Sequence, residues 1–131
     1  MGAEREALRA AKRVVVKVGT STLTYDTGRL NLNRIEYLVR ELADLAHSGR
    51  QVILVSSGAV VVGRSRLGIA RRPNSVQEKQ AMAAVGQGIL MQTYEKLFAE
   101  YGLNVAQILL TKADVTNGKR YENACNPFQM L

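Results

Sequence analysis

The sequence predicts an α/β protein, a three-layer α/β/α sandwich built on a mostly parallel sheet. Three short runs rich in aliphatic and β-branched residues are typical of strands: residues 14–18, 51–55 and 103–111. Segments with apolar residues at helical spacing separate them, so strands and helices alternate along the chain. Alternation of this kind favours parallel strands with helices covering both faces of the sheet.

The first half of the chain predicts an arm, a strand and an amphipathic helix, in that order. Residues 1–12 mix acidic and basic side chains and predict a short helical or frayed arm. The run VVVKV, residues 14–18, is β-branched and predicts a strand buried on both faces. Asn33 and Glu36 have the spacing of a capping box, so we expect the helix to begin there and to end near Gly49.

The second half predicts two helices, a third strand and a C-terminal helix. Small residues at 59–68 predict a short helix, and a long helix is expected from Gln77 to Tyr101. Residues 103–111, LNVAQILLT, predict the third strand. A further helix begins at Arg120, although Pro127 falls inside it and would be tolerated only near a helix start.

Composition narrows the classes of function. The chain has 131 residues, the length of one domain, and a formal net charge of +7 from 18 Lys and Arg against 11 Asp and Glu. The basic residues are scattered, which favours small anionic ligands and no nucleic-acid partner. Cys125 is the single cysteine, so an intramolecular disulfide is excluded. No apolar run approaches the ~20 residues of a membrane span, and we expect a cytoplasmic protein without a membrane partner.

Three polar segments each follow an expected strand: residues 17–21, 56–59 and 111–114. Because parallel strands end at the same edge of a sheet, these segments are expected to converge. Lys17 would provide a fixed positive charge, and Gly19 would let backbone N–H groups approach an anion, a pairing that suits phosphoryl transfer. The alternative is that Lys17 is a strand-end lysine whose amine reaches solvent.

Ser57, Gly58 and Ala59 lie where a strand gives way to a helix. Backbone amides at that junction could hold a carboxylate or phosphate, with the serine hydroxyl as a further donor. The alternative is that Ser57 only caps the helix. A nucleophilic serine is excluded because the Gly-x-Ser-x-Gly elbow is absent, and the single histidine, His47, is expected to interact with a helix C-terminus. The Walker A order of glycines followed by Lys-Ser/Thr is also absent.

Other side chains have structural explanations. One stripe on the long helix is expected to be core and consists of Met82, Val85, Ile89, Leu97 and Phe98. Asp114 could be a metal or substrate ligand, but a turn-forming role is the commoner one for a loop aspartate.

Taken together, five segments resemble the amino-acid kinase family, and within it the glutamate 5-kinase branch. They occur in the family's order and at about its spacing: residues 14–24, 52–68, 79–98, 106–115 and 120–128. Aspartokinases and acetylglutamate kinases resemble this layout but carry a paired glycine after the lysine, where this chain has Lys17-Val18-Gly19-Thr20-Ser21.

The resemblance implies ATP-dependent phosphorylation of the side-chain carboxylate of L-glutamate, the first step towards proline. ATP would be the co-substrate with Mg²⁺, and the full-length protein would be a homo-oligomer. Lys17 would be the catalytic lysine, and no residue is assigned to a metal. The implied contacts are Lys17, Gly19, Thr20 and Ser21 for the ATP phosphates, and Ser57, Gly58 and Ala59 for the substrate.

The same resemblance implies that residues 1–131 form a single, truncated amino-acid kinase domain. Family members continue into a further strand with an Asn-Glu-Asn-Asp-like substrate loop and a nucleotide-binding half with a second catalytic lysine. This chain ends at Leu131, inside an expected helix, and we expect it to be incomplete for catalysis alone. Two alternatives stay open: a non-catalytic module of this fold that binds an anion or amino acid, and an anion-binding flavodoxin-like domain.

Overall fold

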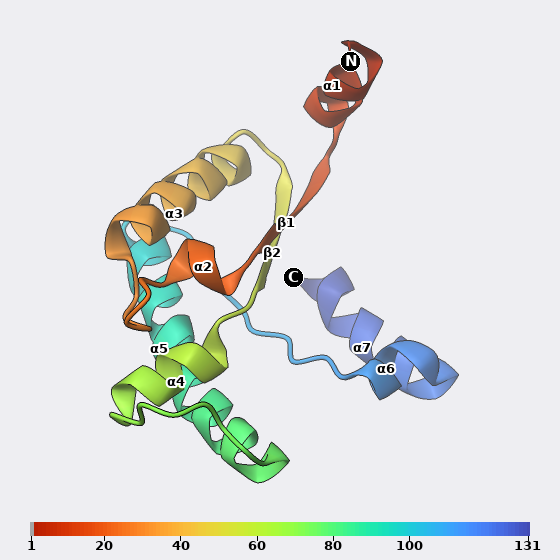
Figure 1. Ribbon diagram of the computed structural model, residues 1–131. Coiled ribbons are helices and arrows are strands. Elements are labelled where there is room, and N and C mark those ends of the chain that lie inside the picture. Colours follow the sequence, from red (N-terminus) through yellow and green to blue (C-terminus); the bar gives the residue numbers. More distant parts are fainter. Residues whose placement is uncertain (1) are drawn as a thin grey trace.

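The computed structural model describes residues 2–131 and confirms an α/β chain with a parallel sheet (Figure 1). Helices and strands alternate through the first half, and helices alone follow β2. In chain order the elements are α1 Gly2–Ala10, β1 Arg13–Val18, α2 Thr20–Leu23, α3 Leu32–His47, β2 Gln51–Ser56, α4 Ala59–Arg66, α5 Val76–Ala99, α6 Lys112–Thr116 and α7 Gly118–Met130.

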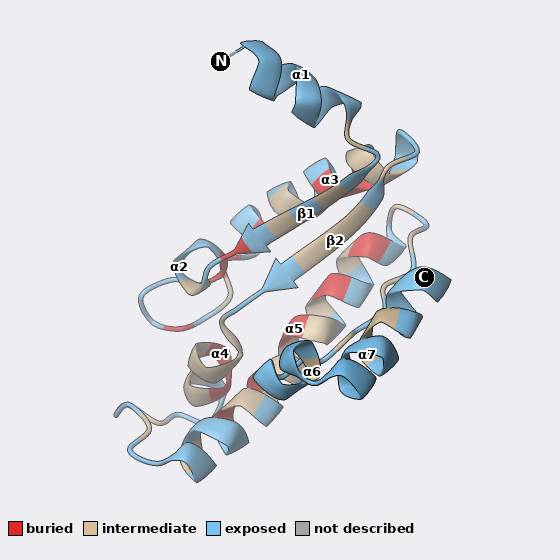
Figure 2. Cartoon of the chain, turned by 90° about the vertical axis from the view of Figure 1, so that its right-hand side faces the viewer, coloured by how far each residue is buried: buried red, intermediate tan, exposed pale blue. Residues whose placement is uncertain are grey.

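The sheet consists of β1 and β2, which pair in parallel from Arg13 opposite Gln51 to Val18 opposite Ser56. Side chains alternate between its two faces, as the period of a strand requires. One face packs on the core, whereas Val15 and Val55 on the other are 60% and 46% exposed (Figure 2). The expectation that the first strand is buried on both faces is therefore wrong, since no element among residues 2–131 closes over the second face.

The core lies between the sheet and helices α3 and α5, which share one side of the strands (Figure 1). Apolar residues at helical spacing give each helix a buried stripe. The buried cluster comprises Val18, Leu23, Ile35, Val39, Leu42, Val62, Leu90, Tyr94 and Phe98. At one end of this layer His47, the last residue of α3, places its Nε2 atom 3.1 Å from the carbonyl oxygen of Tyr101.

Helices α4 and α5 cross at very short range. A Cβ atom built on Gly86 would lie 1.7 Å from the carbonyl oxygen of Ala59, and one built on Gly63 would lie 1.7 Å from that of Met82. Only glycine leaves room for two backbones to approach this closely. The pair of glycines therefore fixes where α4, and the loop that leads into it, lies on α5.

Helix α3 begins two residues earlier than the sequence indicates. The cap is Asn31, whose side chain accepts a hydrogen bond of 3.2 Å from the backbone N–H of Arg34. The backbone N–H of Asn31 donates to the carbonyl oxygen of Leu23 at 2.8 Å. This bond to the end of α2 holds Asn31 outside the helix, and the helix start expected at Asn33 is therefore wrong by two residues.

The expected third strand does not form in the structure. Residues 103–111 form an irregular segment, and Leu109 is 73% exposed. They lead into α6 and α7, which pack on each other on the side of the strands away from α3 (Figures 1 and 2). Pro127 lies well inside α7 rather than near its start, contrary to expectation. Cys125 is half-buried and unpaired with any cysteine, as its single occurrence requires.

Candidate active site

The ends of β1 and β2 bring two of the three predicted segments side by side. The backbone N–H of Ser57 donates to the carbonyl oxygen of Val18 at 3.2 Å, which extends the ladder by one bond. The Ser57 hydroxyl donates to the same oxygen at 3.1 Å, and its Oγ atom lies 3.4 Å from Oγ1 of Thr20. The segments after the two strands therefore contact each other directly, as their position at one sheet edge predicts.

Gly58 turns the chain from β2 into α4. It caps the helix with φ +100°, a left-handed conformation that favours glycine. Ala59 is the first residue of α4, and the backbone N–H groups of that first turn have no intrahelical acceptor. Together with the helix dipole, they make the Gly58–Ala59 junction suited to an anionic group.

Gly19 lies at the start of α2 in extended backbone, with φ −85° and ψ 165°. Any residue adopts this conformation, so backbone geometry does not require a glycine here. A Cβ atom built on Gly19 would meet nothing within 4 Å among the described residues. What the missing side chain provides is open space beside the backbone. Two residues after Gly19, the carbonyl oxygen of Ser21 accepts a hydrogen bond of 3.1 Å from the Arg34 side chain, which links α2 to α3.

Lys17 lies on β1 opposite Val55, one residue before the strand ends. Strand alternation places its side chain on the exposed face of the sheet, opposite to that of Val18. Within residues 2–131, no ion pair or hydrogen bond engages its ammonium group. A lysine in this position can therefore direct its charge to an anion held at the strand ends.

Sequence reasoning did not identify Tyr94, whose side chain contacts the end of β2 where the Ser57–Ala59 segment begins. The side chain is 5% exposed, and its hydroxyl oxygen lies 2.9 Å from Oγ of Ser56, the last residue of β2. Burial raises the pKa of Tyr94, partly offset by this hydrogen bond. Its spacing in the sequence could have indicated that it is buried. Tyr94 lies four residues after Leu90 and four before Phe98, on the buried face of α5.

The third predicted segment, residues 111–114, forms a separate structure. Asp114 accepts hydrogen bonds of 2.7 Å from both the backbone N–H and the hydroxyl of Thr111, and forms an ion pair of 3.1 Å with Arg120. These contacts lower the pKa of Asp114, chiefly through the bonds from Thr111. Asp114 is thus a capping residue of α6, which fits the turn-forming alternative.

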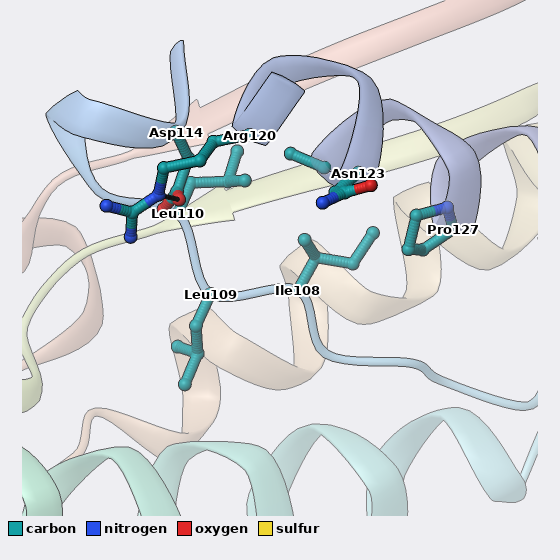
Figure 3. Close-up of a pocket in the computed structure, with 8 residues that line it drawn as sticks. Ile108, Leu109, Leu110, Asp114, Arg120, Asn123 and Pro127 are labelled. Carbon is teal, nitrogen blue, oxygen red and sulfur yellow. Dashed lines mark hydrogen bonds and ion pairs between the residues drawn. The ribbon is translucent and has the colours of Figure 1, made fainter. Parts of the chain in front are cut away.

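Two cavities in the described part of the chain lie away from Lys17 and Ser57. One of about 280 Å³ separates residues 108–110 from α7, with Asp114, Arg120 and Asn123 on its wall (Figure 3). The other, of about 800 Å³, is lined by the segment from Gly28 to Leu32 and by α3, α4 and α5. Neither of these two cavities is lined by Lys17 or by the Ser57–Ala59 segment.

The donor set does not suit a metal held by protein side chains. Across residues 2–131 there is no group of three or more His, Cys, Asp or Glu side chains that could hold a metal ion. Hard cations such as Mg²⁺ require oxygen ligands, which the Lys17 ammonium group and the adjacent backbone N–H groups do not provide. Neither does any helix of the described residues have the length and apolar character needed to cross a membrane.

Comparison with known proteins shows the family of the chain. The profile of the amino acid kinase family matches residues 12–131, and the chain belongs to that family. It is similar to a protein named glutamate 5-kinase from Moorella thermoacetica, with 60% identity over 120 residues that cover 92% of the chain and 32% of that protein. A second relative of that name, from Clostridium tetani, is 58% identical over 127 residues, which cover 97% of the chain and 48% of that protein.

The Clostridium acetobutylicum relative, also named glutamate 5-kinase, is 52% identical over 131 residues and 49% of its own length. The chain therefore spans about a third to a half of the curated relatives it matches.

Proposed function

We propose that this chain contributes the phosphate-binding and glutamate-binding segments of an enzyme that phosphorylates the side-chain carboxylate of L-glutamate with ATP. The observation that carries this proposal is the identity of 58–60%, over 92–97% of the chain, to relatives named glutamate 5-kinase. The geometry of the strand ends supports it, because the segments proposed to bind the two substrates contact each other.

On the phosphate side, Lys17 is proposed to contact the transferred phosphoryl group. Its charge would offset the negative charge that develops on the equatorial oxygens in the transition state. Gly19 lies beside open space, so an ATP phosphate could approach the amides of Thr20 and Ser21 without meeting a side chain. The glycine at this position is explained by ligand approach better than by backbone conformation.

On the substrate side, Ser57, Gly58 and Ala59 are proposed to bind glutamate. The amides at the start of α4 favour a carboxylate. In the structure the Ser57 hydroxyl donates its proton to the carbonyl oxygen of Val18. A ligand carboxylate would compete for that proton, so substrate binding is expected to turn the hydroxyl away from Val18.

The reaction needs no general base from this chain. The glutamate side chain has a pKa of ~4.3 and is an ionised nucleophile at neutral pH. One carboxylate oxygen forms a bond to the γ-phosphorus of ATP while the bond to the bridging oxygen breaks, and its electron pair leaves with ADP. What the protein contributes is alignment and positive charge, and Thr20 beside Ser57 places the two binding segments within reach of each other.

Other properties of the whole enzyme follow from the resemblance as proposals. ATP is expected to bring Mg²⁺. The product, L-glutamyl 5-phosphate, would enter proline biosynthesis in the cytoplasm, and the full-length protein would assemble as a homo-oligomer.

The test uses an extended chain, defined as residues 1–131 followed by the part of the Clostridium tetani relative beyond its matched region. Glutamyl phosphate is trapped with hydroxylamine and measured as the hydroxamate, with L-aspartate in place of L-glutamate as the control substrate. We expect hydroxamate formation that depends on ATP and glutamate. Binding of glutamate without turnover would instead favour the non-catalytic module. If the extended chain shows no binding and no turnover, the proposal is refuted.

A further inference from the structure

A polar group of the core lies directly beneath the loop proposed to bind glutamate. Tyr94 projects from α5 into the buried cluster, and its hydroxyl meets Ser56 Oγ at 2.9 Å. A phenylalanine would fill the same apolar volume, so packing alone does not explain the hydroxyl. A hydroxyl in the core needs a partner, and the partner here is the residue next to Ser57.

The hydrogen bonds continue from Ser56 to the loop. The Ser56 hydroxyl donates to the carbonyl oxygen of Ser57 at 3.3 Å, which leaves Tyr94 as the donor to Ser56. A tyrosine hydroxyl keeps its proton at neutral pH, and burial raises the pKa of Tyr94 further. Ser57 is then held from two directions, by Ser56 through its carbonyl and by Val18 through its N–H and hydroxyl.

Helix α5 supports the same loop at a second point. Gly86 lies against the carbonyl of Ala59, eight residues before Tyr94 on the same buried face. The Ser56–Ala59 segment is therefore fixed to one rigid helix near both of its ends.

We propose that Tyr94 is a positioning residue for glutamate, which acts through Ser56 to hold Ser57 and Gly58 in the geometry that binds the substrate. This inference rests on the proposed function, since it concerns the loop assigned to glutamate. Tyr94 does not itself touch the substrate. Loss of its hydroxyl leaves the aromatic ring in the core and removes the hydrogen bond that orients the Ser56 hydroxyl towards the Ser57 carbonyl.

The experiment compares Tyr94→Phe, Ser56→Ala and the double variant in the extended chain. Tyr37→Phe is the matched control, because Tyr37 is 65% exposed on α3. For Tyr94→Phe and for Ser56→Ala we expect the KM for glutamate to rise about 3- to 10-fold, while the KM for ATP and the thermal midpoint change little. The double variant should resemble either single one, because both remove the same link. Ser56→Thr keeps the hydroxyl and should restore the parent KM.

The outcomes separate the two proposals. If the parent is active and both single variants keep its KM for glutamate within twofold, the positioning role is refuted while the proposed function stands. Equal increases in the KM values for both substrates, accompanied by a lower thermal midpoint, indicate general loss of packing and also refute it. If the unmutated extended chain neither binds nor phosphorylates glutamate, the proposed function fails and the inference fails with it.

Discussion

Substituting Gly86 by alanine tests the close crossing of α4 and α5 on which the loop geometry depends. The new Cβ atom would lie 1.7 Å from the carbonyl oxygen of Ala59, whereas real Cβ contacts are essentially never under 3.0 Å. The helices must therefore separate by about 1.3 Å at this point. Overpacking lowers the free energy of unfolding by ~1–3 kcal/mol. We expect a value of about 3 kcal/mol, because the new Cβ atom would meet backbone atoms and not the end of a flexible side chain. Alanine recovers ~1 kcal/mol of helix propensity, so we expect a net loss of about 2 kcal/mol.

Gly88→Ala is the matched control, because it lies on the same helix with nothing within 4 Å of its Cβ position. It should stabilise the protein by up to ~1 kcal/mol, so the two variants should differ by about 3 kcal/mol. Urea unfolding of the extended chain, followed by circular dichroism, measures both. The reasoning is refuted if Gly86→Ala is as stable as the parent.

The remaining predictions concern the N-terminal ends of α3 and α5. Asn31→Ala should lower the free energy of unfolding by ~1 kcal/mol through loss of the α3 cap, and Asn33→Ala should change it little; a reversed order of the two melting temperatures would contradict the structure. Glu78 has its pKa lowered to about 2, first by its hydrogen bonds with Arg71 and then by the backbone N–H of Asn74. Its stabilising effect is complete above its ordinary pKa of about 4.5 and is lost as the pH falls towards 2. Arg71→Ala should return the pKa of Glu78 towards 4.5 in an NMR titration, and an unchanged value would show that the ion pair is not formed in solution.

The paired strands could be predicted from the sequence because their signal is local and strong. Residues 14–18 and 51–55 are rich in β-branched and aliphatic residues, and the helix between them has apolar residues at helical spacing. Two strands joined by a helix pair in parallel, which places Gly19 and Ser57 at one edge. The contact between the two loops follows from topology, without knowledge of any side-chain distance.

The features that the sequence did not indicate depend on long-range contacts. Residues 103–111 have a strand-like composition, but a strand also needs a ladder partner, and among the described residues they have none. Asn31 and Asn33 are equally good caps locally, and the bond from Asn31 to Leu23 decides between them. The hydroxyl of Tyr94 acquires its role only because α5 packs beneath the end of β2, next to Ser56.

The measurement that tests the central claim most directly is the effect of Lys17→Ala on hydroxamate formation by the extended chain. Lys12→Ala is the control, because Lys12 comes immediately before β1, at the end of the strand away from Lys17. Loss of a preorganised charge at a transferring phosphoryl group should lower kcat by ~10²-fold or more, while the KM for glutamate stays within about twofold. A kcat within threefold of the parent would contradict the account, because Lys17 would then be only a strand-end lysine that extends into solvent.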